Sequence, residues 1–141
     1  MSTHQTLLAL DYGTRKLGVA VGQTLTRTAT GIAVLPVRTL DPNWAQLDAL
    51  VQRWKPDAFV VGLPLNMDDS EGPASVRARQ FITKLDARYG KPIHGVDERL
   101  STREARDITR QNAERAGKRP NSRALVDALA AQLLLESYFE N

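Results

Sequence analysis

Asp11 stands where a carboxylate is costly to bury without a partner. It closes the apolar run Thr6–Asp11, in which strand alternation places Leu7, Ala9 and Asp11 on one face. A charge there requires an ion pair, hydrogen bonds or a metal ion. The simpler alternative is that Asp11 only caps the turn that follows it, because Asp and Gly are common turn residues.

Asp127 lies on the edge of an apolar stripe in the last predicted helix. At helical spacing this stripe consists of Val126, Leu129, Ala130, Leu133 and Leu134. At about 100° per residue, Asp127 falls beside Leu134 rather than on the solvent face. An acid at that position needs either a buried arginine or a metal ion shared with Asp11, and we favour the shared metal.

A third acid follows the predicted strand Ile93–Asp97. Asp97 and Glu98 stand where this strand becomes a loop, and ligands of α/β proteins bind beyond the carboxyl ends of parallel strands. The local alternative is a surface salt bridge to Arg99 or Arg103, which would contribute little to stability. Adjacent strand residues point to opposite faces, so Asp97 and Glu98 are both candidates.

Three acids on three elements could converge at one edge of a sheet. They would hold one or two divalent cations, about 3.5–4 Å apart in a two-metal site, and support attack of water on a phosphodiester. Cations relieve the mutual repulsion of such a carboxylate cluster. The chain has no cysteine and two histidines, His4 and His94, so we expect oxygen ligands and Mg²⁺ or Mn²⁺.

Polar and basic residues near the first acid are candidates for binding a phosphate backbone. Gly13 allows a tight turn, after which Thr14, Arg15 and Lys16 offer one hydroxyl and two cations. Asn66 follows the fourth predicted strand and could contact substrate. The alternatives are an ordinary hairpin turn for residues 13–16 and a flexible loop around residues 67–70.

A second basic group lies between residues 99 and 123, where the acids do not balance the cations. Its candidate phosphate contacts are Arg99, Arg103, Lys118, Arg119 and Arg123. A concentrated basic segment is typical of proteins with a phosphate-rich partner, here a nucleic acid. The alternative is a solvated helix face with ion pairs between neighbouring turns.

The elements that position these residues follow from the hydrophobic pattern. Strands are predicted at Thr6–Asp11, Leu17–Gly22, Gly31–Val37, Ala58–Leu63 and Ile93–Asp97. Helices are predicted from Asp41 as N-cap with Pro42 in the first position to Lys55, from Pro73 to Tyr89, from a capping box at Ser101–Glu104, and from Asn121 or Ser122 to Tyr138.

The connections between these elements predict the sheet. Short links make the first three strands an antiparallel meander, and the helix before each of the last two makes it a parallel crossover. This α/β pattern resembles the RNase H-like fold, whose five-stranded mixed sheet has the order 3-2-1-4-5 with flanking helices. With 141 residues, 42% of them hydrophobic, we expect a single domain over residues 1–141.

No apolar stretch approaches the roughly 20 residues of a membrane-spanning helix, and the N-terminus is a poor fit to a signal peptide. We therefore expect a cytoplasmic protein with no membrane partner. Trp44 and Trp54 lie on an apolar helical stripe, so we expect them in the core rather than stacked on bases.

Four sequence blocks, in order along the chain, resemble those of the YqgF family. They are DYGTRKLGVAVG, VVGLPLNMDDSEG, VDERLST and DALAAQLLLESY. Members of that family are described as Holliday junction resolvases and as nucleases that mature the 5′ end of pre-16S ribosomal RNA. The resemblance implies an RNase H-like fold, a divalent metal and phosphodiester hydrolysis. It also implies a bacterial cytoplasmic setting in ribosome biogenesis, with ribosomal particles as further partners.

The resemblance carries the catalytic and metal-binding acids to Asp11, Glu98 and Asp127. Many RNase H-like nucleases place the second acid at the end of the fourth strand, but here no acid follows that strand before Asp68. Glu98 follows the fifth strand, two strands from Asp11, or roughly 9.5 Å away at about 4.8 Å per strand. We prefer Glu98 as the second acid, with Asp97 as its alternative.

The sequence leaves several functions open. The first is a metal-dependent endonuclease acting on pre-16S ribosomal RNA, and the second is the same chemistry on a Holliday junction. A nucleotide-binding protein is a third, because D-x-G-T also resembles the phosphate loop of the actin and sugar-kinase superfamily, although such proteins use two domains. A non-catalytic RNA-binding assembly factor is a fourth, but three retained acids would hinder the binding of phosphate.

Overall fold

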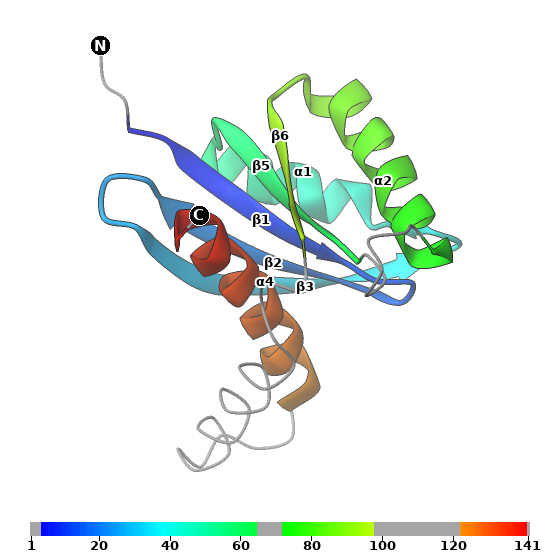
Figure 1. Ribbon diagram of the computed structural model, residues 1–141. Coiled ribbons are helices and arrows are strands. Elements are labelled where there is room, and N and C mark those ends of the chain that lie inside the picture. Colours follow the sequence, from blue (N-terminus) through cyan, green and yellow to red (C-terminus); the bar gives the residue numbers. More distant parts are fainter. Residues whose placement is uncertain (1–3, 65–71, 98–121, 141) are drawn as a thin grey trace.

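In the computed structural model, the described residues form a six-stranded sheet with helices on both faces (Figure 1). The structure describes residues 4–64, 72–97 and 122–140, with the side chains of residues 122–127 excepted. The strands are β1 (Thr6–Tyr12), β2 (Lys16–Gln23), β3 (Thr28–Arg38), β4 (Asp41–Pro42), β5 (Ala58–Leu63) and β6 (Ile93–Asp97). The helices are α1 (Trp44–Trp54), α2 (Pro73–Tyr89) and α4 (Ser122–Glu140).

The strand order is β4-β3-β2-β1-β5-β6. Strands β1, β2 and β3 pair antiparallel, whereas β5 runs parallel to β1 and β6 parallel to β5. The predicted meander, the two crossovers and the order of the five predicted strands are therefore confirmed. The helix predicted from Ser101 lies outside the described residues.

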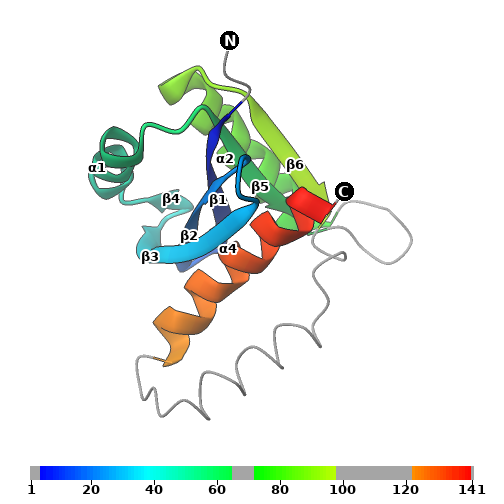
Figure 2. The same cartoon turned by 90° about the vertical axis from the view of Figure 1, so that its left-hand side faces the viewer.

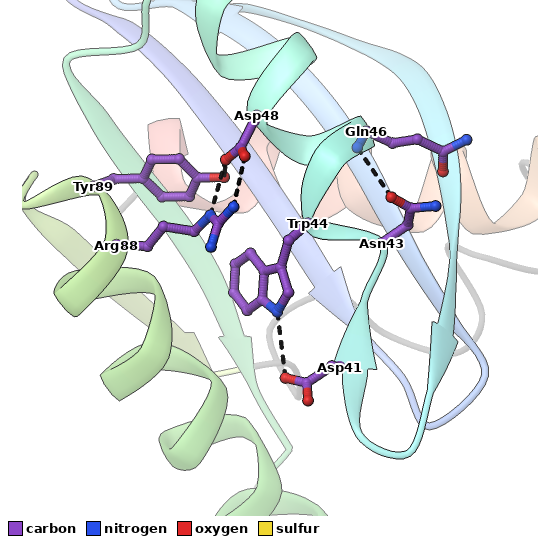
Figure 3. A network of polar contacts seen from close by, with 7 residues as sticks. All are labelled: Asp41, Asn43, Trp44, Gln46, Asp48, Arg88 and Tyr89. Carbon is purple, nitrogen blue, oxygen red and sulfur yellow. Dashed lines mark hydrogen bonds and ion pairs between the residues drawn. The ribbon is translucent and has the colours of Figure 1, made fainter.

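The predicted start of the first helix is wrong. Asp41 and Pro42 form β4, which pairs with the end of β3 and adds a sixth strand to the edge of the sheet. The helix begins after Asn43, whose side-chain oxygen accepts a hydrogen bond from the backbone N–H of Gln46 (Figure 3). A proline suits an edge strand as well as a helix start, because both positions tolerate its fixed φ and its missing N–H.

The remaining helix ends follow the sequence signals. Lys55 closes α1 and Gly90 closes α2, both with a left-handed backbone. Pro73 occupies the first turn of α2, as predicted. None of the described helices has the length and apolar character needed to cross a membrane.

Two hydrophobic cores lie on opposite faces of the sheet. The helices that cover them lie on opposite sides of the sheet in Figure 2. Helices α1 and α2 cover the first core, which includes Leu8, Leu10, Leu47, Phe59, Phe81 and Leu85. Helix α4 covers the second core, which includes Leu7, Ala9, Ala20, Val60, Ala131, Leu134 and Leu135. Trp44 and Trp54 pack against the first core, which confirms their predicted structural role.

Helix α4 lies unusually close to the sheet because two positions beneath it are glycine. A Cβ atom on Gly31 would lie 2.6 Å from the Ala128 carbonyl oxygen, and one on Gly22 would lie 2.6 Å from the Leu135 side chain. The Gly31 N–H also donates a 3.0 Å hydrogen bond to the side-chain oxygen of Gln132. These contacts fix the position of α4 along β2 and β3.

A polar network joins α1 to α2 on the other face (Figure 3). Both Asp48 carboxylate oxygens accept from Arg88, at 2.9 and 2.6 Å, and Asp48 also accepts from the Tyr89 hydroxyl at 2.6 Å. The Arg88 guanidinium lies over the Trp44 ring, 5.1 Å from its centroid. The hydrogen bonds from Arg88 and then Tyr89 lower the pKa of Asp48 to about 2.

We predict that Gly31→Ala lowers the free energy of unfolding by about 1–3 kcal/mol, because the new methyl group overpacks the contact with Ala128. The sign is diagnostic, since Gly→Ala at an unstrained site usually stabilises through the unfolded state. Urea unfolding measures the change, with the exposed neighbour Thr30→Ala as control. A Gly31→Ala protein as stable as the unsubstituted chain would contradict the close packing.

We also predict an acid-dependent contribution from Asp48. Its pKa is lower in the folded chain than the ordinary value of 3.8, so its contribution is fully present above that value. The contribution is lost as pH falls through about 2. Unfolding free energies between pH 2 and pH 6 should show the advantage over Asp48→Asn shrinking below about pH 4. A difference that stays constant with pH would argue against the network.

Candidate functional site

Asp11 is half-buried near the end of β1, on the face of the sheet that α4 covers. It shares strand phase with Leu7 and Ala9, which belong to the core beneath α4. On β2 its direct partner is Gly18. The carboxylate therefore lies at the end of a buried strand, beside a position that carries no side chain.

Strand β5 provides a second glycine beside Asp11. The β1–β5 ladder pairs Leu10 with Val61, so the next residues along, Asp11 and Gly62, lie at the same level. Gly62 is buried and shares strand phase with Val60 of the α4-side core. With glycine on both neighbouring strands, no side chain of those two positions occupies the space next to the Asp11 carboxylate.

The buried stripe of α4 differs in phase from the predicted stripe. Ala130 and Leu134 are buried as predicted, but Ala131 and Leu135 are buried where the sequence suggested positions 129 and 133. Position 127 lies one turn before Ala131 and two turns before Leu134. The helical repeat therefore gives position 127 the phase of Ala131 and Leu134 rather than that of the edge of the predicted stripe.

The N-terminal half of α4 lies nearer than its C-terminal half to the end of the sheet that carries Asp11 (Figures 1 and 2). Near its C-terminus Leu135 lies against Gly22, which pairs with Leu7. Closer to its N-terminus, Ala128 lies against Gly31. Gly31 pairs with Ala20, which pairs with Ala9 of β1. Ala9 is two residues nearer to Asp11 than Leu7 is. The backbone of α4 thus approaches the level of Asp11 as it nears position 127.

Asp97 lies on the opposite face of the sheet from Asp11. Ile93 packs against the core under α1 and α2, whereas Val96 is buried in the core under α4. His94 follows the same alternation, because its ring stacks with Tyr138 of α4 at 5.4 Å. Strand alternation therefore turns Asp97 toward the α2 side.

The loop between β1 and β2 is exposed at the same end of the sheet. Thr14, Arg15 and Lys16 are all exposed there. The loop is closed by a 2.9 Å hydrogen bond from the Gly13 N–H to the Lys16 carbonyl, and the Arg15 carbonyl accepts from the Val37 N–H at 2.8 Å. These bonds hold the three side chains within a few residues of Asp11 and confirm the predicted hairpin turn.

Several predicted site residues lie outside the described residues, namely Asn66, Glu98, Arg99, Arg103, Lys118 and Arg119. Arg123 and Asp127 lie on α4, but the structure describes only their backbone. Within the described part of the chain, no three His, Asp or Glu side chains gather into a metal-binding group. Asp11 belongs to that part of the chain, whereas Glu98 and the Asp127 side chain do not.

The sequence interpretation missed Tyr12, which anchors the end of β1 on the side away from Asp11. Its ring stacks on Phe81 of α2, with centroids 4.6 Å apart and an angle of 11° between the planes. Its hydroxyl donates a 2.6 Å hydrogen bond to the Leu40 carbonyl, and burial raises the pKa of Tyr12. Strand alternation could have placed Tyr12 opposite Asp11, but not its partners.

Comparison with known proteins extends these observations. Residues 5–141 match the model of the RuvX family, described as Holliday junction resolvase. A protein of Chromohalobacter salexigens named "Putative pre-16S rRNA nuclease" is 50% identical over 133 residues, which cover 94% of this chain and 88% of that relative. A protein of the same name from Azotobacter vinelandii is 48% identical over 138 residues, covering 98% of this chain and 95% of that relative.

Two solved structures of Thermus thermophilus RuvC share the fold. The first has a TM-score of 0.55 at 16% identity and covers 92% of each chain. The second, RuvC in complex with a Holliday junction substrate, has a TM-score of 0.55 at 18% identity and covers 92% of this chain and 90% of RuvC.

The sheet order and the RuvC structures define an RNase H-like fold, as predicted. Within that class, the match over almost the whole sequence and the identity to the curated relatives are decisive. The chain belongs to the RuvX family, also called YqgF, which is a family of nucleases. The resemblance carried by the four sequence blocks is confirmed.

Proposed function

We propose that this chain is a metal-dependent endonuclease that matures the 5′ end of pre-16S ribosomal RNA in the cytoplasm, as one domain over residues 1–141. The names of its close relatives support the RNA substrate. The observation that carries the proposal is the position of Asp11, half-buried on the face of the sheet that α4 covers. Helix α4 approaches the same end of the sheet and carries Asp127.

The surroundings of Asp11 fit a divalent cation. A half-buried carboxylate between two glycines offers oxygen donors, which hard cations such as Mg²⁺ and Mn²⁺ prefer. We assign Asp11, Glu98 and Asp127 as the residues that hold the metal. When bound, it would supply Lewis-acid activation of the scissile phosphate and of the attacking water.

Glu98 is our choice for the second acid because Asp97 turns toward the α2 side, away from Asp11. Glu98 is the next residue along the chain. A strand that continued its alternation for one more residue would give position 98 the phase of Val96, on the same side as Asp11. Strand alternation and the family resemblance therefore both favour Glu98.

The exposed loop after β1 is the proposed first contact with substrate. Thr14, Arg15 and Lys16 would bind phosphate oxygens beside the scissile group. The further proposed contacts are Asn66, Arg99, Arg103, Lys118, Arg119 and Arg123. Contacts of this kind hold the nucleic-acid backbone and position it without reading bases. The three-dimensional structure of the substrate would then determine where it is cleaved. A precursor RNA within a ribosomal particle would provide such a structure.

A Holliday junction is the second candidate substrate. The family description names this activity, and RuvC, which shares the fold, has been solved with such a junction. Both substrates present phosphodiesters in a structured backbone, so the same carboxylates would serve either. A direct comparison of a pre-16S ribosomal RNA fragment with a four-way DNA junction distinguishes the two.

We predict that Asp11→Asn, Glu98→Gln and Asp127→Asn each lower cleavage by about 100-fold or more, because each removes a charge that the reaction requires. The assay uses purified protein, Mg²⁺ or Mn²⁺, and both substrates. Asp97→Asn is the matched control and should retain activity. Equal losses in Asp97→Asn and Glu98→Gln would contradict our choice of the second acid.

The same assay tests the nuclease proposal as a whole. Cleavage that is absent, or that survives Asp11→Asn and Asp127→Asn, would refute it. Tight RNA binding without cleavage would support a non-catalytic assembly factor instead. Turnover of ATP without nucleic acid would support a nucleotide-binding protein.

We predict that Arg15→Ala combined with Lys16→Ala makes nucleic-acid binding less sensitive to salt. Each lost phosphate contact lowers the slope of log affinity against log salt by roughly 0.7–0.9, so the pair should lower it by about 1.5. Binding is measured with chelator present to prevent cleavage. Arg53→Ala on α1 is the control and should leave the slope unchanged. An unchanged slope in the double loop variant would contradict the prediction.

A further inference from the structure

The first turn of α2 opens at the same end of the sheet as Asp11. Helix α2 follows β5, which runs parallel to β1, so its N-terminus lies near the carboxyl ends of these strands. Gly72 at the N-cap provides no side-chain hydrogen bond, and no acidic residue occupies the first turn. This helix end therefore has neither a cap nor a negative charge of its own among the described residues.

Two backbone N–H groups in this turn have no acceptor among the residues that the structure describes. The Val76 N–H donates to the Gly72 carbonyl at 3.1 Å and begins the helical hydrogen bonds. The preceding N–H groups, those of Ala74 and Ser75, have no acceptor inside the helix, and the described residues provide none. Pro73 and Ala74 are exposed, so solvent reaches this end of the helix.

Ser75 adds a buried hydroxyl without a partner. Its exposed fraction is 0%, and its hydroxyl oxygen makes no hydrogen bond. Buried polar atoms are nearly always paired in folded proteins, so an orphan of this kind calls for an explanation. Each Cα–Cβ bond in a helix tilts toward the N-terminus, so the Cβ of Ser75 leans back toward the first turn.

A positive charge accompanies this turn. Arg77 lies one turn before Phe81, whose ring stacks on Tyr12, the residue after Asp11. Arg77 follows Ser75 by two residues and is half-buried, which keeps its charge close to this end of the helix.

We propose that the first turn of α2 is a phosphate-binding subsite, in which the Ala74 and Ser75 N–H groups and the Ser75 hydroxyl bind a phosphodiester of the nucleic acid. The N-terminal end of a helix favours anions because its N–H groups and its dipole both point at them. Arg77 adds the countercharge. The nucleic-acid source of the phosphate rests on the function proposed above.

The subsite is separate from the proposed carboxylate site. Helix α2 covers the sheet face opposite α4. A bound strand would therefore cross the end of the sheet that carries Asp11, with the scissile group on the α4 side and another phosphate on α2. Two anchors on opposite faces would set the direction of the strand across Asp11.

Amide chemical shifts of ¹⁵N-labelled protein test the subsite directly. Inorganic phosphate and a short single-stranded RNA are titrated separately, with chelator present, while the Ala74 and Ser75 amides are followed. Both probes should give saturable shifts. Ser75→Ala should weaken phosphate binding about ten- to a hundredfold, the usual effect of losing a hydrogen bond to a charged group.

Stability provides the second readout. Because the Ser75 hydroxyl has no partner to lose, Ser75→Ala should unfold no more easily than the unsubstituted chain. Thr83→Ala is the matched control, since it removes a hydroxyl from the same helix that donates to the Arg79 carbonyl at 3.1 Å. Its phosphate affinity should be unchanged. Arg77→Gln is a second variant and should lower the salt slope of RNA binding by about 1.

The absence of saturable shifts, or unchanged phosphate affinity in Ser75→Ala, would overturn the subsite. Shifts with inorganic phosphate but not with RNA would overturn its assignment to nucleic acid. No metal or cleavage is needed in these titrations. A failed cleavage assay with intact shifts would therefore contradict the proposed nuclease function and leave the subsite standing.

Discussion

Helix α4 touches β2 and β3 at Gly22 and Gly31, and this contact determines how α4 lies on the sheet relative to Asp11. A side chain at either glycine would lift the helix from the sheet. The hydrogen bond from Gly31 to Gln132 holds the helix along its axis, and the buried Ala131 and Leu134 hold its rotation. The backbone of α4 thereby approaches the level of Asp11 as it nears position 127, although Asp127 and Asp11 are far apart in the sequence.

The last two residues of β1 contribute side chains to opposite faces of the sheet. Alternation sends Asp11 to the α4 side and Tyr12 to the α2 side, where Tyr12 packs against Phe81. Packing on one face thus steadies a carboxylate on the other. The same division separates Asp97 from Asp11 and places α2 on the face of the sheet opposite Asp11. A substrate that crosses the end of the sheet would meet acids on one side and N–H donors on the other.

Most of the fold could be predicted because strand alternation, helix spacing and short connections are local signals. Pro42 misled the prediction because a helix start and an edge strand make the same demands on its backbone. The phase of α4 shifted because small residues such as Ala131 can face the sheet where it carries glycine. The face of Asp97 required the observed packing of β6, and nothing in the sequence marks the Ser75 hydroxyl as unpaired.

We propose that Asp11 and Asp127 hold a common cation. A double-mutant cycle of Mn²⁺ binding, measured by titration calorimetry, tests this proposal most directly. The unsubstituted chain should bind Mn²⁺ saturably, and Asp11→Asn and Asp127→Asn should each weaken that binding. If the two carboxylates share one cation, the loss of Mn²⁺ binding free energy in the double variant should be much smaller than the sum of the two single losses. Strictly additive losses, or affinity unchanged by either substitution, would contradict the shared site.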